Sequence, residues 1–165
     1  MFKVNDYVVY GSTGVCQIVD ISQENIMDDN KVTEYYVLQP VFDDTMTIKI
    51  PVDNTKVLMR RIITKDDVKS LIKTIPEQET VWIEDNKERI KFFKEAIRSG
   101  NCEEWIKVIK TLYLEKEERS EEGKKLTKTD EDLMKTAEKF LHEEFAVVLN
   151  ISPEEVPSYI EKHIS

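Results

Sequence analysis

The sequence predicts two domains: a small all-β barrel of the Tudor or SH3-like kind, followed by an all-α bundle of about four to five helices. Apolar side chains alternate at a period of two in the first sixty residues, which is typical of half-buried strands. Beyond residue 62 they recur three or four positions apart, as on amphipathic helices. We expect a β domain over residues 1–62, a short helix and linker over 63–80, and a helical domain over 81–165.

Five short strands are expected in the first domain. They are rich in β-branched and aromatic residues and are separated by turns containing Gly, Asp, Asn or Pro. A polar loop is expected at residues 27–30. A small sheet of this kind closes into a barrel to avoid exposed edges. The predicted strands are residues 4–10, 15–21, 35–41, 46–50 and 57–59.

Capping residues mark the helix starts of the second domain. Asp, Asn, Ser or Thr at these positions accepts a backbone N–H of the first turn, and an acid three residues later completes a capping box. Trp105 lies on the apolar stripe of one of these helices, which indicates a core residue. The predicted starts are Thr64, Asp85 with Glu88, Asn101 with Glu104, Thr129 with Asp132, and Ser152 before Pro153.

Catalytic and metal-binding motifs are absent from the sequence. It contains no glycine-rich nucleotide motif, no HExxH and no GxSxG. Two cysteines, Cys16 and Cys102, and two histidines have no metal-ligand spacing. We therefore expect a non-enzymatic protein without a metal or cofactor. A small enzyme whose site forms across the two domains is the alternative.

No apolar run approaches the roughly 18 residues of a membrane span, and residues 1–11 lack the apolar segment of a signal peptide. We therefore expect a cytoplasmic protein that does not bind membranes. A cytosolic chain would keep both cysteines reduced.

The charge of the chain limits its partners. The formal net charge is −9 and the isoelectric point is about 4.9, whereas free nucleic-acid-binding domains usually carry a basic face. Residues 1–75 hold nine Lys/Arg and eleven Asp/Glu, net −2, and residues 76–165 hold fifteen and twenty-two, net −7. Strong independent DNA binding is not expected. Any DNA contact must come from a local basic patch that a partner brings close to the DNA.

Trp82 lies where the linker meets the next helix, and it has two interpretations. The ring either fastens this junction onto the bundle, or it is exposed and stacks on a base or wedges against one. Basic residues spaced i, i+4, i+7 and i+11 form a ridge on the following helix, beside which we expect the ring. The residues alone favour neither interpretation. The ridge consists of Lys87, Lys91, Lys94 and Arg98, and Arg89 lies on the same helix.

Residues 115–128 contain almost no apolar side chains. They are expected to form the end of one helix and an exposed loop. A solvated connector is one interpretation of this segment. Contact of Lys124, Lys125 and Lys128 with phosphate is the other.

Long segments of the chain resemble a known family. FKVNDYVVYGSTGVCQIVDI, TEYYVLQPVFDDTMTIKIPVDN and RRII resemble the first domain shared by CarD-type regulators and transcription-repair coupling factors. LYLEKEERSEEGKKLTKTDEDLMKTAEKFLHEEFA resembles the helical domain of the CarD group. The resemblance implies a bacterial transcription regulator that docks on the β subunit of RNA polymerase and stabilises the promoter open complex.

The resemblance also implies roles for individual residues. Lys49, flanked by Ile48 and Ile50, matches a strand edge that contacts polymerase, although Lys49 would point outward from a barrel strand in any case. Trp82 matches the family tryptophan that leans into the minor groove at the bubble edge, and Arg89 and Lys91 match residues that hold phosphate. Four additional residues, 83–86, separate Trp82 from the basic helix.

The expected partners are the polymerase β subunit and, weakly, promoter DNA, and the chain is expected to be a monomer. The alternative is a protein-only adaptor whose helical domain binds another protein rather than DNA. The net charge of −7 on residues 76–165 favours this alternative.

Overall fold

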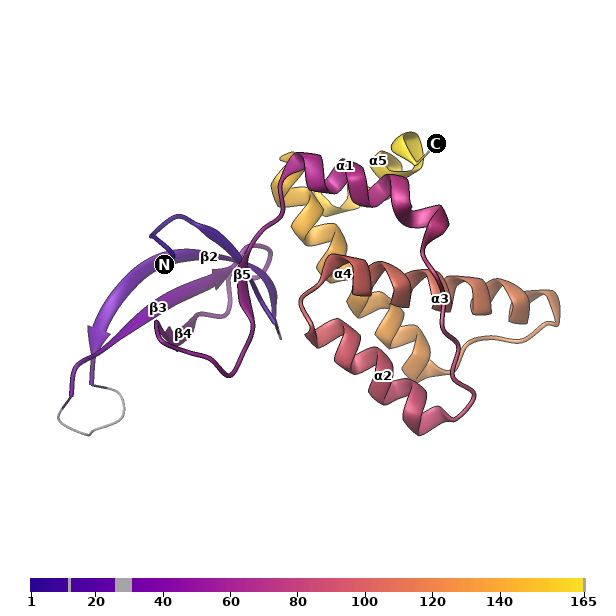
Figure 1. Cartoon of the computed structure of the whole chain (residues 1–165), viewed down its shortest axis with the longest axis horizontal. Helices are drawn as coiled ribbons and strands as arrows, with labels where there is room; N and C mark the ends of the chain where they lie inside the picture. The colour runs from indigo at the N-terminus through magenta and orange to yellow at the C-terminus, as the bar shows by residue number, and fades with distance from the viewer. Residues whose placement is uncertain (12, 26–30, 165) are drawn as a thin grey trace. The chain divides into compact units, whose positions relative to one another are not determined.

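Figure 1 shows a computed structural model of the chain, which describes residues 1–11, 13–25 and 31–164. The chain divides into two compact units, the first spanning Met1–Ile62 and the second Ile63–Ser165. The first unit is a five-stranded antiparallel sheet and the second contains five α-helices, which confirms the predicted fold class. The predicted loop at 27–30 lies outside the described residues. No helix in the described part of the chain is long and apolar enough to span a bilayer.

The sheet of the first unit has the strand order β4-β3-β2-β1-β5. The last strand returns to pair with the first, so β4 and β5 are the two edges. No ladder joins these edges within the described residues, so backbone hydrogen bonds do not close the expected barrel there. The strands are β1 Tyr7–Tyr10, β2 Gly14–Glu24, β3 Thr33–Pro40, β4 Ile48–Pro51 and β5 Met59–Arg61.

Both edges of the sheet nevertheless cover the same core. Ile50 of β4 is part of the buried cluster, and Met59 of β5 packs against that cluster. A bulge between Ile18 and Asp20 interrupts the pairing of β2 with β3, and a bulge of this kind bends a strand. The sheet is therefore bent around this cluster. The buried cluster consists of Val8, Cys16, Ile18, Tyr36, Leu38 and Ile50.

The first strand is shorter than predicted because the backbone turns before it. Asn5 has a φ of 80°, in the left-handed region that asparagine tolerates better than most residues. The Asn5 N–H donates to the Ile18 carbonyl at 2.7 Å. The Ile18 N–H in turn donates to the Asp6 carbonyl at 2.9 Å, so this segment is bonded to β2 before β1 begins at Tyr7.

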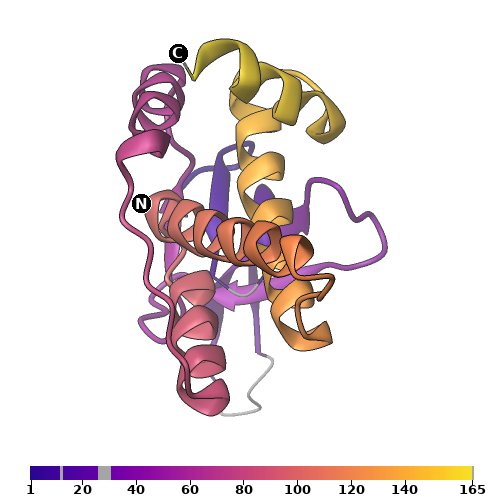
Figure 2. The ribbon, with the colours of Figure 1, turned by 90° about the vertical axis from the view of Figure 1, so that its right-hand side faces the viewer.

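The second unit is built around its longest helix, α4, which contacts each of the other four α-helices. Figures 1 and 2 show α1 and α5 at one end of α4 and α2 at the other. The segment of residues 63–80 belongs to this unit, since Val68 and Ile72 of α1 are fully buried. The helices are α1 Lys65–Thr74, η1 Ile75–Glu77, α2 Asn86–Arg98, α3 Cys102–Glu121, α4 Lys128–Leu149, η2 Pro153–Glu155 and α5 Val156–His163.

Three predicted helix starts are confirmed: Thr64, Asp85 and Asn101 accept backbone N–H groups of the first turns of α1, α2 and α3. The predicted start of α4 at Thr129 is wrong. Thr127 is the cap, and its hydroxyl accepts the N–H of Asp130 at 3.1 Å.

Trp105 belongs to the core of the second unit, as predicted. It is fully buried, and its indole N–H donates to the Ile97 carbonyl at 2.9 Å. Its ring packs against Phe140 with a centroid separation of 5.6 Å.

Candidate nucleic-acid interface

The centre of the candidate site is a buried ion pair between α2 and α4. Arg89 and Asp130 are 2 % and 0 % exposed. Arg89 Nε lies 3.2 Å from Asp130 Oδ1, and Nη2 lies 2.9 Å from Oδ2. Two parallel hydrogen bonds of this kind give an arginine–carboxylate pair a fixed orientation. The cap at Thr127 places Asp130 in the first turn of α4, at the position where it meets Arg89.

The other nitrogens of Arg89 bind the segment that precedes α2. Nη1 donates to the carbonyls of Ile83 at 3.0 Å and Glu84 at 3.4 Å. Nη2 also donates to Asn86 Oδ1 at 2.7 Å. The prediction that Arg89 holds DNA phosphate is therefore wrong, because the guanidinium is buried and its hydrogen bonds are made within the protein.

Trp82 lies against two arginines. The Cζ atom of Arg89 is 4.4 Å from the centroid of the indole ring, and that of Arg119 is 5.6 Å from it. Both distances fall in the range of cation–π contacts. The ring is half-buried, so it packs on the bundle and still presents part of its surface. The contacts within the protein agree with a ring that fastens the junction, and contact of its exposed part with a base stays a prediction.

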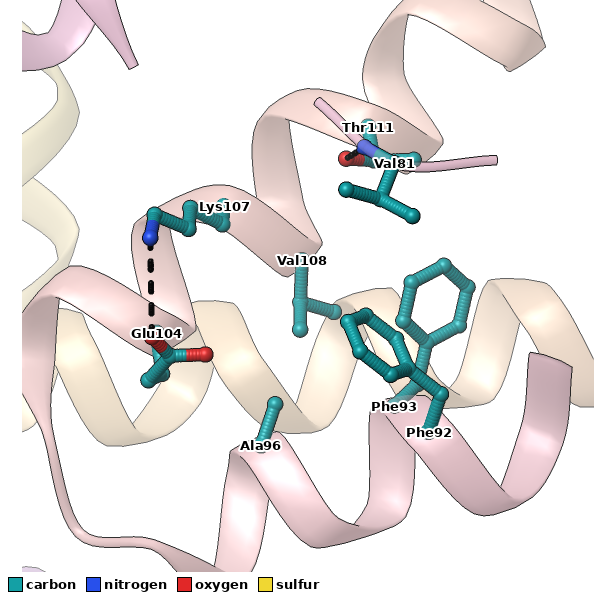
Figure 3. Close-up of a pocket in the computed structure, with 8 residues that line it drawn as sticks. All are labelled: Val81, Phe92, Phe93, Ala96, Glu104, Lys107, Val108 and Thr111. Carbon is teal, nitrogen blue, oxygen red and sulfur yellow. Dashed lines mark hydrogen bonds and ion pairs between the residues drawn. The ribbon is translucent and has the colours of Figure 1, made fainter. Parts of the chain in front are cut away.

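The residue before Trp82 is fastened to α3. The Val81 N–H donates to Thr111 Oγ1 at 3.3 Å, and Thr111 is buried. Figure 3 shows the Val81 side chain facing the rings of Phe92 and Phe93 across a small apolar pocket. The segment that carries Trp82 is thus attached to the bundle on both sides of the ring.

Arg119, which contacts the ring of Trp82, also binds the predicted lysine loop. Its Nε pairs with Glu115 Oε1 at 3.0 Å, and its Nη1 donates to the Lys125 carbonyl at 3.3 Å. The Lys124 N–H donates to the Arg119 carbonyl at 2.7 Å. Lys124 and Lys125 are exposed. The backbone of these lysines is therefore held near the tryptophan.

The basic ridge of Lys87, Lys91, Lys94 and Arg98 is exposed along α2. It lies on the face opposite the buried residues Arg89, Phe93 and Ala96, because two residues correspond to about 200° around a helix. The ring of Trp82 contacts Arg89 and Arg119, neither of which belongs to the ridge. The expectation that the ring lies beside the ridge is corrected accordingly.

The third predicted lysine of the loop, Lys128, lies in the first turn of α4. Its ammonium pairs with Asp132 at 2.9 Å, and this hydrogen bond raises the pKa of Lys128. Its side chain is 82 % exposed, so the pair is a surface pair of the kind that contributes little to stability.

The predicted polymerase-binding residues lie on β4, an edge strand that pairs only with β3 among the described strands. The side chains of Ile48 and Ile50 pack on the core, whereas that of Lys49 is exposed. Lys49 Nζ lies 2.7 and 2.8 Å from the two carboxylate oxygens of Glu24 on β2. The hydrogen bond to Lys49 lowers the pKa of Glu24.

Comparison with known proteins identifies the family. Residues 2–63 match a family described as CarD-like/TRCF RID domain, and residues 70–161 match the CarD C-terminal domain. The chain belongs to the CarD family. Over 162 residues it is 25% identical to a Bacillus subtilis (strain 168) protein called "Putative transcription factor YdeB", covering 96% of this chain and 99% of that protein. A role in transcription regulation follows from membership in the CarD family.

Three residues of the site were not predicted from the sequence: Thr111, Arg119 and Asp130. Glu115 and Arg119 have the i, i+4 spacing of a helical ion pair, which could have indicated that α3 continues through this segment. Thr111 belongs to no motif. Asp130 has capping-box spacing from Thr127, but the sequence offered the same spacing for Thr129 and Asp132, where the cap was expected. Within the described residues, no three His, Cys, Asp or Glu side chains cluster in a way that could hold a metal ion.

Proposed function

We propose that this CarD-family regulator docks on the β subunit of RNA polymerase through its first unit and stabilises the promoter open complex through Trp82. The observation that carries the DNA part is a half-exposed tryptophan held against two guanidinium groups. The backbone of the exposed Lys124 and Lys125 is hydrogen-bonded to one of these arginines, Arg119. DNA contact is weak and independent of sequence. In this role the chain would act in the cytoplasm and bind polymerase as a monomer.

The edge strand β4 supports the docking proposal. An exposed edge can accept a strand from a partner through main-chain hydrogen bonds, which require little sequence specificity. The side chains of Ile48 and Ile50 pack on the core and fix the position of this strand in the sheet. Lys49 adds a charge on the exposed face, although it must exchange its contact with Glu24 for a partner carboxylate.

Stacking and phosphate contact support the DNA proposal. An aromatic side chain stacked on an unpaired base contributes about 1–3 kcal/mol, and this contact would be lost when the bubble closes. Lys124 and Lys125 are the candidates for phosphate contact beside the ring. Lys87, Lys91 and Lys94 remain candidates on the other face of α2.

The DNA proposal is tested by the lifetime of the open complex with Trp82→Ala. We expect the lifetime to fall by about fivefold or more, since 1 kcal/mol or more of stacking is lost. The matched control is Tyr113→Ala, which removes an exposed aromatic ring elsewhere in the second unit. An unchanged lifetime in folded Trp82→Ala protein would contradict a wedge role.

The docking proposal is tested by binding of Lys49→Glu protein to the isolated β lobe of polymerase. We expect weaker binding, because the substitution reverses a charge on the edge strand and places it beside Glu24. Lys56→Glu makes the same change of charge in the loop after β4 and should bind normally. Equal binding of both variants would exclude Lys49 from the interface.

A protein-only adaptor is the second candidate. The net charge of −7 on residues 76–165 favours it, and the side chains of Val81 and Phe92 are exposed beside the apolar pocket. An adaptor of this kind would retain polymerase binding and show no effect of Trp82→Ala on the open complex.

A further inference from the structure

We infer that the buried Arg89/Asp130 pair positions Trp82, and that the main role of Arg89 is to orient this ring rather than to stabilise the bundle. The consequence for DNA rests on the function proposed above. The positioning itself is a property of the free protein and can be measured without DNA or polymerase.

The first argument is that a buried ion pair is a poor way to stabilise a helical bundle. Desolvation of both charges offsets much of their attraction, and apolar residues of similar volume often serve as well or better. Stability of the bundle therefore does not explain why an ion pair, rather than two apolar residues, is buried between α2 and α4.

The second argument is the distribution of the arginine's hydrogen bonds. Two of them go to Asp130, which fixes the plane of the guanidinium relative to α4. Three more go to the segment just after Trp82, at the carbonyls of Ile83 and Glu84 and the side chain of Asn86. A methionine or leucine in place of Arg89 would fill the volume but could make none of these contacts.

The third argument is the contact with the ring itself. Arg89 lies closer to the indole than Arg119 does, at 4.4 against 5.6 Å. Arg119 is also committed to Glu115 and to the Lys125 carbonyl. The segment around Trp82 forms no helix or strand of its own, so its conformation depends on such side-chain bonds. Arg89 is the residue that joins the ring, the segment and α4.

The experiment replaces both partners at once, with Arg89→Met and Asp130→Leu in the full chain. A merely structural role of the pair would be satisfied by two apolar residues, so the double variant should keep the unfolding midpoint of the wild type. Arg98→Met, on the exposed ridge of the same helix, is the matched control. Each protein carries 5-fluorotryptophan, and Trp82→Phe assigns the two fluorine resonances.

We expect the Trp82 resonance to shift and broaden in the double variant, and the collisional quenching of its fluorescence by acrylamide to increase. The Trp105 resonance should stay in place, because that ring is buried and bonded to Ile97. If the double variant is folded and its Trp82 resonance and quenching match the wild type, the inference is overturned.

A second variant covers the case in which the double variant does not fold. Arg89→Lys keeps a cation beside Asp130 but lacks the planar fork, which two-point pairing and stacking both require. We expect a folded protein with the same loss of order at Trp82. An unchanged Trp82 resonance in this variant would also overturn the inference.

The open-complex lifetime separates this inference from the proposed function. If both hold, the double variant should lose most of the lifetime that Trp82→Ala loses, with binding to the β lobe unchanged. If the fluorine and quenching changes appear but Trp82→Ala has no effect on the lifetime, the positioning stands and the proposed DNA contact fails.

Discussion

At the scale of single residues, the role of a cation in this chain depends on the carboxylate it meets. Arg89 and Arg98 lie on the same helix. The family resemblance implied a phosphate contact for Arg89, whereas Arg98 was expected on the basic ridge. Arg89 meets Asp130 inside the protein, whereas the side chain of Arg98 is exposed. The difference arises because only Arg89 lies on the face of α2 that packs on α4.

His142 of α4 leads to a prediction about pH. Burial lowers its pKa from the ordinary 6.5, so the folded protein favours the neutral imidazole. The unfolded chain therefore binds a proton more readily, and stability falls as the pH decreases from about 6.5 through the lowered folded pKa. Unfolding by urea at several pH values should show that the stability of wild type relative to His142→Gln shrinks in acid. A difference that stays constant with pH would contradict this prediction.

At the scale of elements, the start of α4 shows how a correct type of cap can be assigned to the wrong residue. The sequence Thr127-Lys128-Thr129 offers two hydroxyls, each followed three residues later by an aspartate. The structure uses Thr127, which places Asp130 in the first turn, opposite Arg89. The buried ion pair therefore selects between two caps that local geometry leaves equivalent.

The choice of cap can be measured by unfolding in urea. Thr127→Ala should destabilise the protein by about 1 kcal/mol, because the N–H of Asp130 loses its acceptor. Thr129→Ala is the matched control at an exposed helical position, and it should be neutral or slightly stabilising. A larger loss with Thr129→Ala than with Thr127→Ala would restore the cap expected from sequence.

The carbonyls just after α1 are bound by a side chain that is distant in the sequence. The ammonium of Lys110 on α3 donates to the carbonyls of Ile75, Pro76 and Gln78 at 2.8–3.0 Å. A cation at this position satisfies carbonyls that a helix end leaves without partners. No pattern near residues 75–78 predicts this contact, because its donor is more than thirty positions away in the chain.

At the scale of the whole molecule, the net negative charge of the chain limits its binding to DNA. The net charge of −9 opposes approach to a polyanion, and the exposed lysines are too few to reverse it. The proposed DNA contact therefore depends on the concentration that polymerase binding provides.

The free protein should bind a promoter fragment more weakly than about 10⁻⁴ M at physiological salt, the weak end of non-specific DNA binding. Fluorescence anisotropy of a labelled fragment, with and without polymerase, measures this directly. Submicromolar binding by the free chain would show that polymerase is not needed to bring it to DNA.

Lys124→Glu together with Lys125→Glu should weaken the contribution of the chain to the polymerase–promoter complex and leave β-lobe binding intact.

The sequence by itself determined the two kinds of domain, three helix caps, the buried position of Trp105 and the overall charge. These properties follow from the period of apolar residues and from contacts within one turn of a helix, both of which are local. The tertiary structure alone decided that Arg89 is buried with Asp130, that Val81 is fastened to Thr111, and that Lys49 pairs with Glu24. These partners lie 41, 30 and 25 positions apart in the chain. Which of them meet depends on how whole elements pack, and local patterns carry no information about that.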